Sequence, residues 1–313
     1  MPDIIVMFFV LGLFAGSIGS DLRVPKAAYN VLSILLMLTI GLKGGMALHG
    51  NVEWRLIGEL LGVAALGFLI PLVLYPLLRS LVRLNTANAA SFAAHYGSVS
   101  AGTFAVSLAW VESRNMMTGG EVTLYLVLLE LPAILMGLFL YQRLSNRDVA
   151  PGSKLHLLRE PLTNRSVILL AGGVVIGALY GPDMGTGVTA PLTEAFSVVL
   201  ALFLLEMGLV ASETLKKLTR KHWRVVAFAA IAPPLLAIPG LAAALLMDLD
   251  PGNAVILGTL TASASYIAAP VTIRHAIPEA DIGMAMLASL GVTFPFNVLV
   301  GIGLYHQMYL VFQ

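Results

Sequence analysis

The chain has 313 residues, of which 58% are hydrophobic and 11% are charged, and its mean hydropathy is +0.90. A soluble domain carries about 25% charged residues, so this composition excludes a soluble protein and indicates an integral membrane protein. No cysteine is present, which excludes disulfides and thiolate metal sites. The start of the chain lacks the basic residues and the cleavage site of a secretory signal, so we expect it to remain as part of a spanning helix.

Ten apolar segments approach the roughly 20 residues that a helix needs to cross a bilayer. They therefore predict an all-α polytopic membrane protein with ten transmembrane helices, the last of which is long enough to be tilted or broken. The segments are 3–20, 28–48, 56–79, 88–111, 120–142, 165–181, 191–211, 223–246, 253–275 and 282–310.

Lysine and arginine are distributed unevenly over the linkers between these segments. Of the 18 basic residues, 15 fall in the first, third, fifth, seventh and ninth linkers. Positive residues gather on the cytoplasmic side of a membrane, so those linkers are predicted to be cytoplasmic and both termini to lie outside the cytoplasm. The longest of them, 144–164, is the predicted linker between two halves of the chain.

The sequence also repeats itself. Residues 88–105 are similar to residues 253–270, a shift of 165, and Pro132 in the fifth segment corresponds to Pro295 in the tenth at a shift of 163. Ten helices with both ends on one side divide into two five-helix halves, and an odd number of helices per half reverses the second half. We therefore predict an inverted repeat of residues 1–143 and 165–313, as in many secondary transporters.

The repeated segments contain small and hydroxyl-bearing residues near the middle of the fourth and ninth helices. Such residues are unfavourable in helix interiors because their side chains compete for backbone hydrogen bonds. We therefore expect both helices to be broken near the midplane, which a bilayer tolerates only where the freed backbone groups are buried in protein or line a cavity. The two interruptions are Gly97, Ser98, Val99 and Ser100, and Ala262, Ser263, Ala264 and Ser265.

Two broken helices meeting in one place can hold ions of both signs. Free N–H groups at helix starts attract an anion, whereas carbonyls at helix ends, with nearby hydroxyl, amide or carboxylate oxygens, suit sodium. The two interruptions above are the predicted anion-binding residues. The candidates for sodium are Glu130, Thr293, Asn297, Thr103 and Thr261. The alternative is that the small residues only allow close helix packing, but two clusters at matching positions favour the functional interpretation.

Other polar residues in the apolar segments are less informative. Glu130 and Glu206 are predicted to lie inside the bilayer, where an ionisable group indicates a functional site, although Glu206 fits a structural role equally well. His95 is expected to be a packed, neutral histidine. The sequence contains no nucleotide-binding loop, no H-E-x-x-H and no nucleophile elbow, so we expect no enzymatic activity, no transport driven by ATP and no nucleic-acid partner.

Several stretches together resemble the sodium-dependent bicarbonate transporter family of cyanobacteria and other bacteria. They are distributed over both halves, so the resemblance covers essentially the whole membrane region. The stretches are Ala94-His95-Tyr96-Gly97-Ser98-Val99-Ser100, Glu130-x-Pro132-Ala133-Ile134, residues 258–268, Ile277-Pro278-Glu279-Ala280 and residues 288–297.

The resemblance implies bicarbonate uptake coupled to sodium as the coupling ion, without a further cofactor, in the cell inner membrane. It also implies a homotrimer embedded in lipid, in which a core domain slides against a gate domain in an elevator mechanism. Cyanobacterial members bind a cytoplasmic regulator of the PII type, but the linker 143–164 is shorter here, which argues against such a partner. From the residues alone, a sodium-coupled carrier of another small anion and an anion channel remain open.

Overall fold

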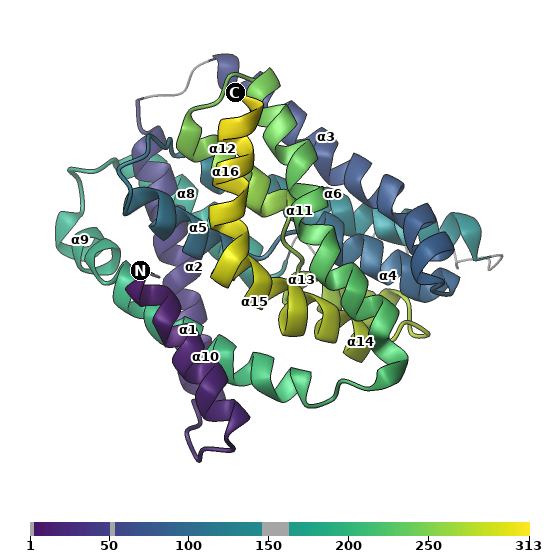
Figure 1. Cartoon of the computed structure of the whole chain (residues 1–313). Coiled ribbons are helices and arrows are strands. Elements are labelled where there is room, and N and C mark those ends of the chain that lie inside the picture. Colours follow the sequence, from purple (N-terminus) through teal and green to yellow (C-terminus); the bar gives the residue numbers. More distant parts are fainter. Residues whose placement is uncertain (1–2, 51–53, 146–162) are drawn as a thin grey trace.

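The computed structural model describes residues 3–50, 54–145 and 163–313, and all regular structure in those residues is helical (Figure 1). The helices are α1 (Ile4–Ser17), α2 (Lys26–Leu48), α3 (Trp54–Leu77), α4 (Thr86–Gly97), α5 (Ala101–Glu112), α6 (Glu121–Leu144), α8 (Arg165–Tyr180), α9 (Thr186–Glu194), α10 (Phe196–Leu215), α11 (Trp223–Leu246), α12 (Pro251–Thr261), α13 (Ala268–Ala276), α14 (Ile282–Met286), α15 (Phe294–Phe296) and α16 (Ile302–Phe312).

Six helical stretches in the described residues are long and apolar enough to cross a membrane, which makes this a polytopic membrane protein. They are Lys26–Leu48, Trp54–Val82, Glu121–Leu144, Phe196–Leu215, Arg220–Leu246 and Ile282–Phe312. The other four predicted spans correspond to the shorter apolar helices α1 and α8 and to the interrupted pairs α4–α5 and α12–α13. Most of the predicted linker, residues 146–162, lies outside the described part of the chain.

Helix α9 differs from the predicted pattern. It begins in the linker before the predicted span 191–211 and ends within that span. Gly185, with φ of +80°, precedes it, and Ala195 alone separates it from α10. None of its residues is buried. Hydropathy indicates which segments are buried or cross the membrane. It therefore does not separate a short surface helix from the spanning helix that directly follows it.

Four helices form a bundle of their own, in which α1 packs on α10 and α2 packs on α8. Glycines allow both contacts: Gly12 of α1 lies against Gly208 of α10, and Gly41 of α2 lies against Gly173 of α8. Small residues four apart let membrane helices approach closely and gain van der Waals contact. We call α1, α2, α8 and α10 the four-helix bundle, which lies on the left of Figure 1 together with α9.

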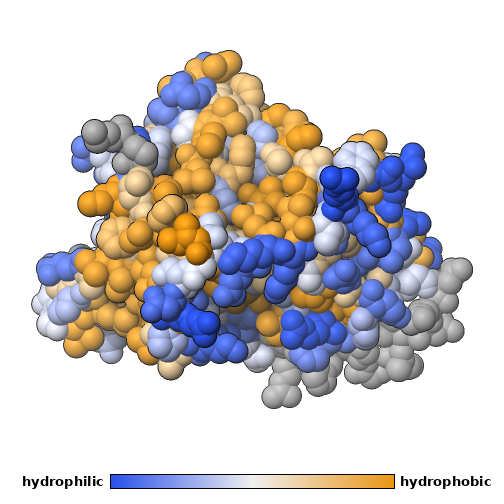
Figure 2. Space-filling model, turned by 60° about the horizontal axis from the view of Figure 1, so that its bottom comes forward, coloured by the Kyte–Doolittle hydropathy of each residue, from blue (hydrophilic) through white to orange (hydrophobic). Residues whose placement is uncertain are grey.

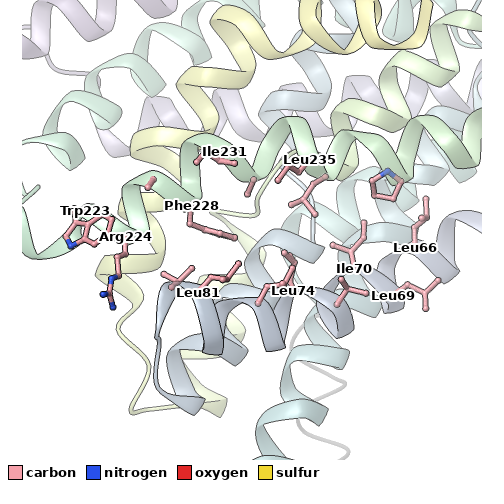
Figure 3. A pocket seen from close by; sticks show the side chains of 17 residues that line it. Leu66, Leu69, Ile70, Leu74, Leu81, Trp223, Arg224, Phe228, Ile231 and Leu235 are labelled. Carbon is pink, nitrogen blue, oxygen red and sulfur yellow. The ribbon is translucent and has the colours of Figure 1, made fainter. Parts of the chain in front are cut away.

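The remaining helices form the core bundle. Helix α3 packs on α4 and α6, while α11 packs on α12 and on the helical stretch 282–312. Helices α3 and α11 also contact each other and border an open groove (Figure 3). Figure 2 shows that apolar residues cover much of one face of the molecule and that hydrophilic residues border them. This surface is the one expected of a protein surrounded by lipid.

The stretch 282–312, predicted to be tilted or broken, is continuous but irregular. Two π-helical turns, Leu287–Thr293 and Asn297–Gly301, flank Pro295. A proline in a helix removes one backbone hydrogen bond and displaces the carbonyl of the preceding turn, and wider turns accommodate that loss. The irregularity brings Thr293 and Asn297 to buried positions facing neighbouring helices.

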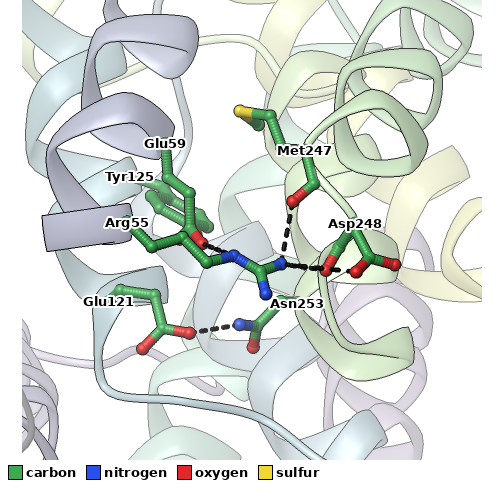
Figure 4. A network of polar contacts seen from close by, with 7 residues as sticks. All are labelled: Arg55, Glu59, Glu121, Tyr125, Met247, Asp248 and Asn253. Atoms are coloured by element: carbon green, nitrogen blue, oxygen red, sulfur yellow. Dashed lines mark hydrogen bonds and ion pairs between the residues drawn. The ribbon is translucent and has the colours of Figure 1, made fainter. Parts of the chain in front are cut away.

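A polar network connects α3, α6 and the turn between α11 and α12 (Figure 4). Arg55 pairs with Glu59 at 3.1 Å, and its guanidinium donates to the backbone carbonyls of Met247 and Asp248. Glu59 in turn accepts a hydrogen bond of 2.7 Å from the Tyr125 hydroxyl. Because Glu59 is largely buried, these partners offset the cost of removing its charge from water.

Adjacent glycines of α8 provide a test of the packing in the four-helix bundle. A Cβ atom on Gly173 would lie 2.9 Å from the Cα of Gly41 and from the Leu38 carbonyl oxygen, whereas a Cβ on Gly172 meets nothing within 4 Å. We expect Gly173→Ala to destabilise the protein by about 1–3 kcal/mol through overpacking. Gly172→Ala should leave the stability unchanged or raise it slightly, because alanine favours a helix. Thermal unfolding of the two purified variants measures this, and equal midpoints would contradict the packing argument.

Candidate functional site

The first interruption separates α4 from α5. Helical geometry ends at Gly97, Ser98 and Ser100 have extended backbone, and the helix resumes at Ala101. Ser100 caps the new helix, because its Oγ accepts hydrogen bonds from the Thr103 N–H at 3.0 Å and from the Thr103 hydroxyl at 2.9 Å. A serine at this position satisfies one of the N–H groups that a helix start leaves free, so the sequence itself favours the restart here.

The second interruption separates α12 from α13. Helical geometry ends at Thr261 and resumes at Ala268. Two serines satisfy backbone groups in this gap: the Ser263 hydroxyl donates to the Leu260 carbonyl at 2.8 Å, and the Ser265 Oγ accepts from the Ala269 N–H at 3.1 Å. Both gaps therefore use serine side chains to end or restart a helix.

The two interruptions cross each other. The Ser100 N–H donates to the Ser263 Oγ at 2.9 Å, and the Ser265 N–H donates to the His95 carbonyl at 2.8 Å. All four of these residues are at most 3% exposed. The starts of α5 and α13 and the ends of α4 and α12 thus meet in one buried region, which we call the crossing site and define as residues 97–100 and 262–265.

Two glycines allow the backbone to come this close. A Cβ on Gly97 would collide with the ring of Pro71 in α3 and would touch Ala133 in α6. A Cβ on Gly102, in the first turn of α5, would collide with the Tyr266 hydroxyl from the second interruption. Larger residues at either position would push the broken helices apart.

Polar groups from two further elements contact the crossing site. The Ser98 hydroxyl donates to the backbone carbonyl of Glu130 in α6 at 3.2 Å. The Asn297 side-chain amide donates to the Ala262 carbonyl at 3.0 Å, and its own oxygen accepts from the Tyr305 hydroxyl at 2.5 Å. The crossing site is therefore enclosed by α6 on one side and by the π-helical turns of residues 282–312 on the other.

The structure brings together some of the predicted sodium residues and not others. Thr103 and Asn297 bond directly to residues 97–100 and 262–265, and Glu130 does so through its backbone. Thr293 bonds elsewhere: its hydroxyl donates to the Ala229 carbonyl of α11 at 2.8 Å and lies 2.8 Å from the Tyr96 hydroxyl. Thr261 bonds back to carbonyls of its own helix and lies against Gly240 of α11.

Three tyrosines near the crossing site were not identified as candidates from the sequence. Tyr96 bonds Thr293, Tyr305 bonds Asn297, and Tyr266 lies against Gly102. Each is buried. Their signal in the sequence is weak, because tyrosine occurs at many positions in membrane helices, although a tyrosine hydroxyl far from the membrane interface needs a hydrogen-bond partner.

His95 is packed within α4, as expected. Its Nδ1 lies 2.7 Å from the Ser91 carbonyl, and its side chain is fully buried. Its Nε2 has no hydrogen-bond partner among the described residues. Because a carbonyl oxygen can only accept, Nδ1 is the donor in this contact.

A cation at the crossing site would be held mainly by neutral oxygens. No group of three or more histidine, aspartate or glutamate residues in the described ranges is arranged to hold a metal ion. Sodium is a hard cation that accepts carbonyl, hydroxyl and amide oxygens as ligands. The carbonyls that end α4 and α12, the side-chain oxygens of Asn297 and Thr103, and the Glu130 backbone carbonyl are ligand oxygens of that kind.

Comparison with known proteins gives the family. No protein of curated function matches the chain. Residues 4–310 match the Na+-dependent bicarbonate transporter superfamily, so the match includes both interruptions and all the helices described above except the last two residues of α16. The chain therefore belongs to the Na+-dependent bicarbonate transporter superfamily.

Proposed function

We propose that this transporter is a sodium-coupled symporter that takes up bicarbonate across the cell inner membrane, with the crossing site as its substrate site. The observation that carries the proposal is the pair of hydrogen bonds that join the two interruptions, from Ser100 to Ser263 and from Ser265 to His95. They hold two helix starts and two helix ends in one buried place. A membrane protein that only needed close packing would gain nothing from interrupting two helices at the same point.

The anion is proposed to bind at the starts of α5 and α13. The first N–H groups of a helix have no partner within it, and the helix dipole adds a partial positive charge there. Bicarbonate is small and has three oxygens, so backbone N–H groups and the serine hydroxyls of the crossing site match its acceptors. The same chemistry suits other small oxyanions, which is why the substrate must be tested directly.

Sodium is proposed to bind beside the anion, at the carbonyl ends of α4 and α12. Asn297 and Thr103 are the nearest of the predicted ligands, and Glu130 contacts the site through its backbone carbonyl, whereas Thr293 and Thr261 bond to groups outside the crossing site. Opposite charges a few ångströms apart attract strongly where water is excluded. Each ion therefore raises the affinity for the other, which is the physical basis of coupling.

The arrangement of contacts supports the predicted ten-helix inverted repeat. In the predicted repeat, α1 corresponds to α8, and α2 corresponds to α10. The contact of α1 with α10 is therefore repeated as the contact of α8 with α2, and both contacts are built on glycines. The repeat also relates two hydrogen bonds: the Asn88 Oδ1 accepts from the Asp281 N–H at 2.7 Å, and the Asn253 Oδ1 accepts from the Gly119 N–H at 2.9 Å. Both asparagines lie at the start of a broken helix, and their partners lie just before a helix of the other half: Asp281 directly precedes α14, and Gly119 is two residues before α6.

Movement between the two bundles would give alternating access. The four-helix bundle and the core bundle are each densely packed, so they are proposed to slide as units in an elevator mechanism, with both termini outside the cytoplasm and a homotrimer as the assembly. Lys43 of α2 and Glu112 of α5 form an ion pair of 2.6 Å between the bundles. That contact would have to break when the bundles slide.

The substrate proposal is tested with labelled bicarbonate and proteoliposomes that carry an inward sodium gradient. Ser263→Ala leaves the buried Ser100 N–H without its acceptor, so we expect about a tenfold loss of uptake efficiency, corresponding to about 1–2 kcal/mol for one buried hydrogen bond. Ser107→Ala is the control, because that buried hydroxyl bonds only its own helix, at Phe104. If the folded wild type takes up no bicarbonate, other small anions become the candidates for substrate.

The sodium proposal is tested by the sodium concentration that gives half-maximal uptake. Asn297→Ala removes a side-chain oxygen and releases the Ala262 carbonyl, and we expect the half-maximal sodium concentration to rise about tenfold or more. Thr259→Val is the matched control, since the Thr259 hydroxyl is buried in α12 but bonds only the Val255 carbonyl. An unchanged sodium requirement in Asn297→Ala would exclude this residue from the cation site.

The sliding proposal is tested by cross-linking, for which the absence of native cysteines provides a clean background. Lys43→Cys with Glu112→Cys, joined by a short bifunctional thiol reagent with a reducible bond, should lose uptake and regain it on reduction. Ser17→Cys with Ser212→Cys is the control: the two hydroxyls are 3.4 Å apart within the four-helix bundle, so the cross-link should leave uptake intact. Uptake that persists with α2 tied to α5 would rule out sliding of these bundles.

A further inference from the structure

A groove with a volume of about 590 Å³ runs between α3 and α11 on the core bundle, and none of the residues that line it belongs to the crossing site (Figure 3). Its walls are leucine, isoleucine, valine, alanine and phenylalanine side chains of both helices, with Pro239 the last lining residue on α11. Several wall residues are open to the surroundings: Leu81 is 72% exposed, and Ile231 and Leu235 are each 58% exposed. An apolar groove of this kind cannot stabilise an ion.

The length of the groove matches a lipid tail. The residues that line it on α11 extend from Trp223 to Pro239, a rise of about 24 Å along a helix. One leaflet of the hydrocarbon core is about 15 Å thick. An extended acyl chain that enters at Trp223 and spans one leaflet is therefore shorter than the groove and fits within it.

The chemistry changes at that end. Trp223 and Arg224 lie side by side, with the guanidinium 5.2 Å from the ring centroid, and Arg224 is the only charged residue among the described residues that line the groove (Figure 3). Arg220 and Lys221, in the turn that leads into α11, are exposed. None of these three cations takes part in an ion pair within the described ranges. A tryptophan with unpaired cations beside it is typical of the membrane interface, where the cations attract anionic headgroups.

We infer that this groove binds one phospholipid with an anionic headgroup. One of its acyl chains lies in the groove between α3 and α11, and its phosphate lies at Arg220, Lys221 and Arg224. Bulk lipid would cover a flat helix face equally well, but a hollow that is longer than one leaflet and ends at unpaired cations selects for both the tail and the headgroup. The binding is independent of bicarbonate and sodium. The linker between the segments 191–211 and 223–246 is predicted to be cytoplasmic, so we assign the lipid to the cytoplasmic leaflet, and this assignment alone rests on the proposed orientation.

The inference is tested by fluorescence quenching in phosphatidylcholine vesicles. Trp54, Trp110 and Trp223 are replaced by phenylalanine, and Ile231→Trp places one reporter in the groove. Two series of vesicles contain the same increasing fractions of either brominated phosphatidylglycerol or brominated phosphatidylcholine. We expect the anionic lipid to quench at about a threefold lower fraction than the zwitterionic lipid. The control reporter, Val175→Trp on α8, is 56% exposed outside the groove and should respond equally to both lipids.

Two pairs of variants separate the tail from the headgroup. Ala227 lines the groove and Ala230 is exposed on the same helix outside it, so Ala227→Phe should abolish the preference and Ala230→Phe should retain it. Replacing Arg220, Lys221 and Arg224 together by glutamine should remove the preference, whereas Arg274→Gln, an exposed cation at the end of α13, should not. Each variant is first checked for monodisperse elution. Each is also made with the α8 reporter, which brominated phosphatidylcholine should quench to the same extent as in the parent protein.

Two results would overturn the inference. Equal quenching by both lipids at the groove reporter would mean that only bulk lipid covers this face. A groove reporter that neither lipid quenches, in a protein that elutes as an oligomer, would mean that a second copy of the chain fills the groove. Because no transport is measured, neither result depends on whether bicarbonate is the substrate.

Discussion

The structure depends on the way in which two interrupted helices satisfy each other inside a membrane protein. A break in a helix frees N–H and carbonyl groups, which hydrocarbon cannot satisfy, so each break alone would be costly. Here the Ser100 N–H bonds Ser263, and the Ser265 N–H bonds the His95 carbonyl. Neither interruption is complete without the other. This constraint also explains the positions of the surrounding helices, because α6 and the stretch 282–312 enclose these hydrogen bonds and keep water out.

Enclosure also explains why the elements around the crossing site are irregular. Asn297 can reach the Ala262 carbonyl because the helix that carries it has π-helical turns on both sides of Pro295. Gly97 and Gly102 leave space for Pro71 and for the Tyr266 hydroxyl. Features that weaken a helix by themselves, namely proline, glycine and serine, are concentrated where close approach and free backbone groups are needed. Local helix stability is lower there, and the backbone groups that this frees are the ones that the proposed ion site would use.

The rest of the molecule is packed for a different purpose. In the four-helix bundle, glycines on facing helices bring the backbones into direct contact. Such contacts are stable in lipid because they gain dispersion energy that lipid tails do not replace. Between this bundle and the core bundle the described contacts are fewer and include an exposed ion pair, Lys43 with Glu112, which contributes little on its own. The difference between dense packing within the bundles and sparse contact between them is what a sliding mechanism requires.

The sequence alone determined the membrane class, the family and the two interruptions, because hydropathy, serine and glycine content and motif spacing are local properties of the chain. It also marked Thr103, Asn297 and Glu130 as residues near the interruptions. Only the tertiary structure decided that Ser100 meets Ser263, that Thr261 bonds back to its own helix, and that Tyr96 and Tyr305 contact candidate ligands. The physical reason is that the direction of a side chain around a helix depends on packing between segments far apart in the chain. The same reason applies to the groove, whose walls are ordinary apolar residues until α3 and α11 lie side by side.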